Sequence, residues 1–209
     1  MKMNLPNKLT LLRLCLVPVL IAFGMLPEAW VPWYISYTVC AVLFIGTAIT
    51  DMLDGKIARK HNLITDFGKF LDPVADKFMV IGAMFVILYK FDNLRTLMIF
   101  ALLIVVFREL AVTSMRLVVS TGQNIVVAAN KLGKLKTVLQ IVAISTVFLE
   151  PVVQLISRKI GELIVGHPLA WRTDIIPLTW VSLCLSVILT VWSGVAYIAA
   201  YWKYLDPEK

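Results

Sequence analysis

Four aspartates within residues 51–76 have the spacing and the chemistry of a metal site. The first pair is Asp51 and Asp54, three positions apart. The second pair is Asp72 and Asp76, four positions apart. These spacings place each pair on one face of a helix, so two helices joined by a short turn would direct four carboxylates toward a common point. Carboxylate oxygens suit hard divalent ions such as Mg²⁺ or Mn²⁺, whereas Zn²⁺ prefers His and Cys. The pattern therefore predicts a site for divalent cations.

The surroundings of these carboxylates make them costly unless cations offset their charge. Both pairs adjoin apolar runs that are long enough to be membrane helices. A charged side chain near the middle of a membrane helix is disfavoured by roughly 3 kcal/mol, so four isolated carboxylates would cost on the order of 10 kcal/mol. Cations or water must therefore reach the aspartates, which favours a functional site over incidental surface charge.

The composition of the chain excludes an ordinary soluble domain. Of the 209 residues, 60% are hydrophobic, and the mean hydropathy is +0.86. A water-soluble fold of this size cannot bury that much apolar surface. We therefore expect a multi-pass membrane protein in which residues 1–209 form one domain, with no nucleic-acid partner. The three cysteines lie in separate apolar segments and have no metal or redox spacing: Cys15, Cys40 and Cys184.

Six apolar segments predict an all-α membrane protein with six transmembrane helices. A short N-terminal interfacial segment precedes them, with Asn7 as the expected cap of the first helix. Each segment has about the 20 residues that a bilayer requires. They cover about residues 9–25, 33–59, 67–89, 94–120, 132–150 and 177–202. Residues 151–176 are amphipathic and form either an interfacial helix or an extension of the fifth helix.

Two polar positions near the third segment leave the start of its helix open. Asp66 lies just before the apolar run and is expected to cap that helix rather than to bind metal. Pro73 disfavours helical backbone at Asp72, the residue before it. Asp72 therefore either lies inside the third helix or caps it, and only the first arrangement aligns it with Asp76.

The distribution of basic residues predicts the orientation in the membrane. With both termini in the cytoplasm, the outer side carries Lys90, Arg95, Arg158, Lys159 and Arg172. The other 15 of the 20 Lys and Arg residues (20 less these 5) then lie on or toward the cytoplasmic side, as the positive-inside rule requires. This orientation also places the carboxylates at the cytoplasmic ends of the second and third helices, where water-soluble substrates have access.

Four basic residues further along the chain predict a phosphate site beside the carboxylates. Arg108 and Arg116 lie two turns apart in an apolar helix, so both are expected to face a polar cavity. Lys134 and Lys136 open the next helix, near backbone N–H groups that favour anions. The alternative for Arg108 is a simple ion pair with Glu109 or with one of the aspartates.

The residues around the carboxylates match a known signature in type and spacing. The match has eight fixed positions, Asp51-x2-Asp54-Gly55-x2-Ala58-Arg59-x8-Gly68-x3-Asp72-x3-Asp76. On these residues the chain resembles the CDP-alcohol phosphatidyltransferase family. Three further segments resemble the bacterial members that use glycerol 3-phosphate: NLPNKLTLLRLCLVP, FRELAVTSMR and ANKLGKLKTVLQ. The likeness covers residues 4 to about 140, and beyond that only the hydropathy agrees.

This resemblance implies a reaction, a metal requirement and an assembly. Family members transfer the phosphatidyl group of CDP-diacylglycerol to a small alcohol, here glycerol 3-phosphate, and release CMP. They often pair as homodimers, and this one would lie in the cytoplasmic (inner) membrane with its lipid substrate. Two Mg²⁺ or Mn²⁺ ions would bind the four aspartates and neutralise the pyrophosphate. Asp76 would also take the proton of the attacking hydroxyl. The resemblance thus implies an enzyme of phospholipid biosynthesis.

The same resemblance implies binding roles for residues around the aspartates. Gly55 and Ala58 would let the cytidine group approach the helix, and Arg59 would bind phosphate. The full set that would contact CDP-diacylglycerol is Asn7, Thr10, Asp51, Gly55, Ala58 and Arg59. The set that would hold the phosphate of glycerol 3-phosphate is Arg108, Arg116, Lys134 and Lys136.

Two alternatives stay open at this point. A sibling enzyme would use serine, inositol phosphate or phosphatidylglycerol as its acceptor. A divalent-cation transporter would also need carboxylates within the membrane. Transporters usually have inverted repeats and helices broken near the midplane, and this sequence shows neither.

Overall fold

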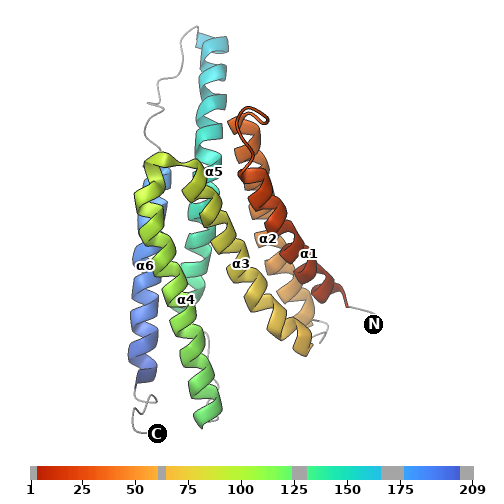
Figure 1. The fold of residues 1–209 in the computed structure, drawn as a ribbon, viewed down its shortest axis with the longest axis vertical. Coiled ribbons are helices and arrows are strands. Elements are labelled where there is room, and N and C mark those ends of the chain that lie inside the picture. The colour runs from red at the N-terminus through yellow and green to blue at the C-terminus, as the bar shows by residue number, and fades with distance from the viewer. Residues whose placement is uncertain (1–3, 61–64, 124–130, 166–176, 203–209) are drawn as a thin grey trace.

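Helices make up almost all of the chain that is described. The computed structural model describes residues 4–60, 65–123, 131–165 and 177–202. Within those ranges it contains no β-strand, and six long α-helices and one short 3₁₀ helix follow one another (Figure 1). The predicted all-α class is therefore confirmed. The bounds are α1 Leu5–Gly24, α2 Trp33–Lys60, α3 Asp66–Lys90, η1 Asp92–Leu94, α4 Arg95–Gln123, α5 Lys131–Val165 and α6 Pro177–Tyr201.

The first helix begins earlier than predicted. The Asn4 side chain accepts a hydrogen bond from the backbone N–H of Asn7 at 3.3 Å, so Asn4 is the cap and the prediction of a cap at Asn7 is wrong. Pro6 fits the first turn because an N–H group there would have no helical partner. Asn7 is thereby a residue of the first turn, and its side chain bonds to Thr65 at the start of α3.

The third helix runs without a break through both of its motif aspartates. Thr65 caps it, and its hydroxyl oxygen accepts a hydrogen bond from the first turn at 3.1 Å. The prediction that Asp66 caps this helix is therefore wrong. Pro73 lies inside the helix. Asp72 consequently lies inside it too and shares a face with Asp76, which is the first of the two arrangements that the sequence left open.

The fifth helix is longer than its predicted membrane span. α5 continues through Pro151 to Val165, so residues 151–165 extend the fifth helix, which was one of the two predicted alternatives. Figure 1 shows the end of α5 projecting beyond the neighbouring helices. The rest of the amphipathic stretch, residues 166–176, lies outside the described residues.

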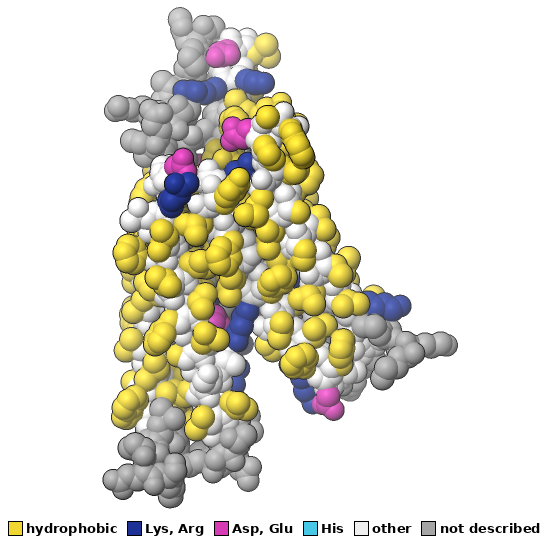
Figure 2. All heavy atoms as spheres, in the orientation of Figure 1, with side chains coloured by type: hydrophobic (Ala, Val, Ile, Leu, Met, Phe, Trp, Pro, Cys, Tyr) yellow, Lys and Arg dark blue, Asp and Glu magenta, His cyan; other side chains and the backbone are white. Residues whose placement is uncertain are grey.

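Most of the helices have the length and apolarity of membrane spans. In the described ranges five segments meet that standard: α1, α2, α4 together with η1, α5 and α6. α3 does not, because charged residues crowd its first half: Asp66, Lys69, Asp72, Asp76 and Lys77. Figure 2 shows apolar side chains over most of the visible surface, as expected of a protein surrounded by lipid. The multi-pass class is therefore confirmed, and a sixth span at α3 stays a prediction.

Close packing between α1 and α3 positions the site. α1 lies against both α2 and α3. A Cβ atom added at Gly82 of α3 would lie 2.9 Å from Val17 Cγ1 of α1, and one added at Gly24 of α1 would overlap Val86 of α3. Only glycine lets the two helices approach this closely at both points. The approach brings the first half of α1 beside the aspartates of α3.

The helices converge at one end of the bundle and spread apart at the other. The apolar core includes side chains from all six α-helices, among them Leu20, Phe44, Ile87, Met98, Phe148 and Leu183. At the opposite end α3 diverges from α4, as Figure 1 shows. Figure 2 shows a hollow between them, with basic and acidic side chains on its walls. Asp72 and Asp76 of α3 line a cavity between α3, α4 and α5.

Candidate active site

The guanidinium of Arg13 is the point at which three motif aspartates meet. Its Nη1 lies 2.8 Å from Asp51 Oδ1 and 2.8 Å from Asp76 Oδ1. Its Nη2 lies 2.5 Å from Asp54 Oδ2. Arg13 belongs to α1, the first pair of aspartates to α2, and Asp76 to α3. The structure thus brings carboxylates of two helices together around a cation that the signature does not contain.

Arg13 carries a sequence signal of its own. It lies in an otherwise apolar run, roughly 12 Å along α1 from the first residue of that helix. A basic side chain at that depth in a membrane helix needs an acidic partner. The cost of charge in an apolar segment therefore marks Arg13 in the sequence as it marks the aspartates.

The fourth aspartate, Asp72, is bound by Thr10. Thr10 Oγ1 lies 2.6 Å from Asp72 Oδ1 and 3.1 Å from the backbone oxygen of Pro6. The single hydroxyl proton serves one acceptor at a time, and the shorter contact with a charged oxygen is the stronger one. Thr10 is almost fully buried. Its hydrogen bond therefore fixes one oxygen of this carboxylate from the α1 side.

Asn7 joins the start of α1 to the start of α3. Its Nδ2 donates a hydrogen bond to Thr65 Oγ1 at 3.0 Å, and the Thr65 hydroxyl lies 3.1 Å from Asn7 Oδ1. A Cβ atom at Gly68, one of the signature positions, would lie 3.0 Å from Asn7 Oδ1 and 3.3 Å from Thr65 Oγ1. Glycine at this position therefore leaves room for the link between the two helices.

The exposure of the side chains gives the carboxylate cluster a sealed side and an open side. The Arg13 side chain is 0% exposed and that of Asp54 is 5% exposed. The side chains of Asp51 and Asp76 are 38% and 47% exposed. α1 therefore seals the cluster on the side of Arg13, and a ligand would reach it at Asp51 and Asp76.

The charge and the donor atoms of this cluster suit divalent cations. Three carboxylates and one guanidinium sum to −2 (three negative, one positive), and Asp72 brings the sum to −3. Residual charge of this size in a partly buried site favours the binding of further cations. The donor atoms are carboxylate oxygens, which Mg²⁺ and Mn²⁺ prefer. Within the described ranges no three His, Cys, Asp or Glu side chains form a ready-made ligand cage, and the Arg13 guanidinium stands where the carboxylates meet.

A cavity of about 420 Å³ extends from the α3 aspartates toward α4 and α5. Its volume is that of a site for a small molecule. Its charged lining consists of Asp72, Asp76, Lys77, Arg108, Glu109, Arg116 and Lys136. Two of the predicted metal ligands and three of the four predicted phosphate ligands therefore share one space.

Glu109 links the two most buried basic residues of this cavity. Its Oε1 accepts hydrogen bonds from Arg108 Nη1 at 2.9 Å and from Lys136 Nζ at 2.5 Å. Arg108 also donates to Ser193 Oγ of α6 at 3.2 Å. The pairing of Arg108 with Glu109 is the alternative that the sequence left open. One carboxylate between two cations leaves a net positive charge at this wall. Glu109 was not among the predicted ligands. Its position beside Arg108 in an apolar helix is the feature of the sequence that indicates this role.

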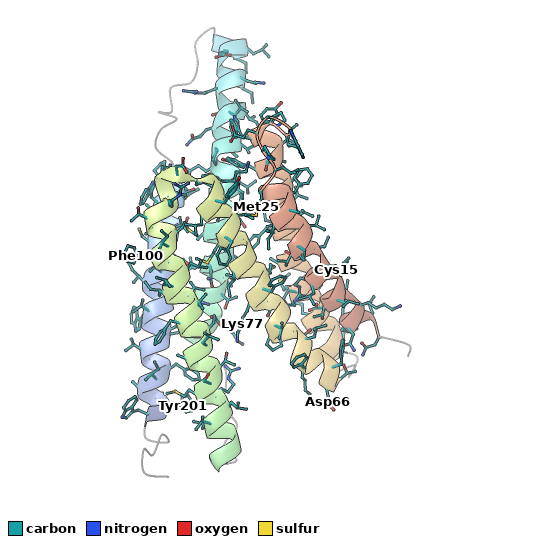
Figure 3. All side chains as sticks on the ribbon, viewed as in Figure 1. Cys15, Met25, Asp66, Lys77, Phe100 and Tyr201 are labelled. Atoms are coloured by element: carbon teal, nitrogen blue, oxygen red, sulfur yellow. The ribbon has the colours of Figure 1, made fainter. Side chains whose placement is uncertain are left out.

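The other basic residues near the cavity divide into those that line it and one that does not. Arg116 is exposed and lines the cavity. Lys134 is exposed and does not belong to the lining, because residues two positions apart on a helix point in different directions and Lys136 faces inward. Lys77 also lines the cavity, although it was not among the predicted phosphate ligands. Its Nζ donates a hydrogen bond to Thr113 Oγ1 of α4 at 2.6 Å. Figure 3 shows Lys77 on α3 between that helix and α4.

The signature residues after Asp54 lie in the last turns of α2. Gly55 is half-buried. The backbone of Ala58 and Arg59 belongs to α2, and their side chains lie outside the described part of the structure. The contacts predicted for these residues with CDP-diacylglycerol therefore stay predictions.

The chain is similar over almost its whole length to several known proteins. The sequence model described as CDP-alcohol phosphatidyltransferase matches residues 3–192. A Bacillus subtilis protein named CDP-diacylglycerol–glycerol-3-phosphate 3-phosphatidyltransferase is 38% identical over 211 residues, which cover 97% of both chains. A protein of the same name from Yersinia enterocolitica is 34% identical over 98% of both chains. Another from Rickettsia felis is 33% identical over 96% of this chain and 97% of its own. The chain therefore belongs to the CDP-alcohol phosphatidyltransferase family.

Proposed function

We propose that this protein transfers the phosphatidyl group of CDP-diacylglycerol to glycerol 3-phosphate, forming phosphatidylglycerophosphate and CMP. Relatives named for this reaction align with it almost from end to end. The structural observation that carries the proposal is the single cavity joining the α3 aspartates to Arg108, Arg116 and Lys136. One wall suits cations and a pyrophosphate, and the other suits the phosphate of an acidic acceptor.

Two Mg²⁺ or Mn²⁺ ions are the proposed cofactors. When bound, such ions neutralise the pyrophosphate of the donor and stabilise the negative charge on the departing CMP. The all-oxygen donor set and the residual negative charge of the cluster support this assignment. The proposed ligands are the four motif aspartates, Asp51, Asp54, Asp72 and Asp76.

Asp76 is the residue proposed to take the proton of the acceptor hydroxyl. Its side chain is 47% exposed and lines the cavity. Arg13 bonds to its Oδ1, so Oδ2 is the oxygen proposed to take the proton. As the proton leaves, the hydroxyl oxygen forms a bond to the phosphorus of the phosphatidyl group, and the bond from that phosphorus to the oxygen of CMP breaks in line.

The phosphate of glycerol 3-phosphate is proposed to bind at the basic wall. Arg108 and Lys136 share Glu109 as their counter-charge, so the three together keep one positive charge for an incoming anion. Arg116 adds a second positive charge from the exposed part of the cavity. Two net positive charges match a phosphate monoester. The role of Lys134 stays a prediction from the resemblance, because its side chain does not line the cavity.

The nucleotide part of CDP-diacylglycerol is proposed to lie over the last turns of α2 and the start of α1. Asp51 supports this placement, because its side chain is 38% exposed on the open side of the cluster. Thr10 is buried against Asp72, so its contact with the nucleotide stays a prediction from the resemblance. The complete proposed set is Asn7, Thr10, Asp51, Gly55, Ala58 and Arg59.

The proposed setting is the cytoplasmic membrane, with both termini and the active site on the cytoplasmic side. The five apolar helices support a multi-pass arrangement, and the division of the basic residues supports this orientation. A lipid donor and a water-soluble acceptor meet at such an interface. A homodimer is proposed from the resemblance to the family.

A CMP-release assay with several acceptors tests the proposed reaction. Purified protein in vesicles that contain CDP-diacylglycerol and Mg²⁺ is given glycerol 3-phosphate, serine, inositol phosphate or phosphatidylglycerol in turn. We expect CMP release with glycerol 3-phosphate and not with the others. Release with serine but not with glycerol 3-phosphate would contradict the acceptor. Divalent-cation flux across the vesicles without any CMP release would favour a transporter.

A further inference from the structure

Arg13 is a buried cation to which neither the signature nor the proposed reaction assigns a role. Its side chain is 0% exposed, and its guanidinium contacts three aspartates from two helices. In the part of the chain that the structure describes, every ion pair of the motif aspartates is with Arg13. A buried charge without a partner is strongly unfavourable. The arginine and the aspartates therefore make each other's burial possible.

The guanidinium neutralises this cluster only in part. It brings one positive charge to three carboxylates, which leaves −2. Its Nε is buried and has no hydrogen-bond partner among the described residues. The position of the side chain is therefore set by its two Nη groups and the carboxylates around them. Arg13 holds the cluster together and leaves most of its charge for other cations.

We propose that Arg13 is a resident counter-cation, which holds Asp51, Asp54 and Asp76 together when divalent cations are absent and competes with those cations for the carboxylates. This inference rests on the proposed function, because it takes divalent cations as the partners of the aspartates. It assigns to α1 a part in controlling how tightly metal binds.

Competition follows from the charges and the distances. The guanidinium lies 2.5–2.8 Å from one oxygen of each carboxylate. It therefore neutralises part of the negative charge that would attract a metal ion. Two cations bound to the same carboxylates also repel each other, and this repulsion is strongest where water is excluded. Each cation therefore weakens the binding of the other, and the coupling is equal in both directions.

The arrangement keeps the metal-free protein folded. Without any cation, the carboxylates of α2 and α3 would repel one another at the place where α1, α2 and α3 pack together. The guanidinium removes much of this repulsion and keeps the three carboxylates within reach of one point. The site is then ready for metal without depending on metal for its structure.

A purely structural arginine would behave differently. Its loss would lower the stability of the protein to the same extent with and without metal. Its loss would also leave metal affinity unchanged or weaken it, because the carboxylates would no longer be held together. Metal binding and metal-dependent stability therefore separate the two roles.

The test compares the parent protein with Arg13→Gln, and Arg95→Gln is the matched control. Arg95 forms an exposed ion pair with Asp92 at the start of α4 and lies outside the site. Each protein is purified in lipid nanodiscs. Mn²⁺ binding is measured by electron paramagnetic resonance, and thermal unfolding is followed in EDTA and in saturating Mn²⁺.

We expect Arg13→Gln to unfold at a much lower temperature than the parent in EDTA and to regain most of that difference in Mn²⁺. Its Mn²⁺ affinity should rise by roughly 5- to 150-fold, the usual range for coupling between two ligands. Arg13→Lys keeps one positive charge and should have an intermediate affinity. Arg95→Gln should match the parent in both measurements.

Equal or weaker Mn²⁺ binding by Arg13→Gln, or a stability loss that Mn²⁺ does not reduce, overturns the role of Arg13. The proposed function then still stands if the parent binds Mn²⁺ and releases CMP. Failure to obtain folded Arg13→Gln even with Mn²⁺ present throughout also overturns it, because the metal should replace the guanidinium. A parent protein that binds no Mn²⁺ overturns both this inference and the proposed metal site.

Discussion

Thr10 and Asp72 are 62 positions apart in the sequence and are joined by a hydrogen bond of 2.6 Å between α1 and α3. Arg13 lies one turn after Thr10 on the same face of α1 and holds the other three motif aspartates. α1 therefore acts as the back wall of the acidic site. The signature residues of α2 and α3 depend on this helix for their positions.

Removing the Thr10 hydroxyl should loosen Asp72. Thr10→Val keeps the shape of the side chain and removes the donor, and a hydrogen bond to a charged group contributes about 2 kcal/mol. We expect a lower unfolding temperature and a higher Mg²⁺ concentration for half-maximal CMP release. Thr10→Ser keeps the hydroxyl and should stay close to the parent. A parental Mg²⁺ dependence in Thr10→Val would mean that this bond does not position Asp72.

Glu109→Gln should leave Arg108 and Lys136 without their shared counter-charge. Breaking a buried ion pair from one side costs about 3–5 kcal/mol, and the partial exposure of Glu109 puts this case at the lower end, about 3 kcal/mol. We expect a lower unfolding temperature that glycerol 3-phosphate raises more in the variant than in the parent, because the anion replaces the lost charge. Equal shifts in the two proteins would argue against anion binding at this wall.

Substitutions of Arg116, which lines the cavity, and of Lys134, which does not, test whether the acceptor phosphate binds inside the cavity. Arg116→Ala should raise the KM for glycerol 3-phosphate about tenfold with little change in kcat, because it removes one charge–phosphate contact worth about 1.4 kcal/mol. Lys134 is exposed and does not line the cavity, so Lys134→Ala should raise this KM much less. Initial rates of CMP release over a range of acceptor concentrations give both values. A larger effect in Lys134→Ala would place the phosphate site elsewhere.

Gly68 should tolerate a methyl group poorly, although it is not among the residues proposed to bind substrate. A Cβ atom there would lie 3.0 Å from Asn7 Oδ1, so Gly68→Ala should disturb the Asn7–Thr65 link and lower stability by about 1 kcal/mol. Gly46→Ala is the matched control, because a Cβ atom at Gly46 meets nothing within 4 Å. That change should be neutral or stabilising, since alanine favours helix. Thermal unfolding of both variants makes the comparison.

The parts of this structure that could be predicted depend on local patterns. Apolar length and helical periodicity located the helices, and the three- and four-residue spacings placed each aspartate pair on one face. The cost of charge in an apolar segment predicted that the pairs would meet and that Arg108 would face a polar cavity. All of these features follow from helix geometry and from the properties of the membrane.

The parts that could not be predicted depend on how the helices pack. Asn4 and Asn7 are both good caps, and only the fit of Pro6 in the first turn decides between them. Lys134 and Lys136 both looked suitable for an anion, but they point in different directions once the rotation of α5 is set. The contact between Arg13 and the aspartates requires the close approach of α1 to α3, which the local pattern does not specify.

Product formation by the parent protein and by Asp76→Asn tests whether the aspartate cluster carries out a metal-dependent phosphatidyl transfer. Both are incubated in vesicles with CDP-diacylglycerol, glycerol 3-phosphate and Mg²⁺, and phosphatidylglycerophosphate is measured by mass spectrometry together with CMP. We expect equal amounts of the two products from the parent, none without a divalent cation, and none above background from Asp76→Asn. Parental rates of both products in Asp76→Asn, or in EDTA, would contradict this role of the cluster.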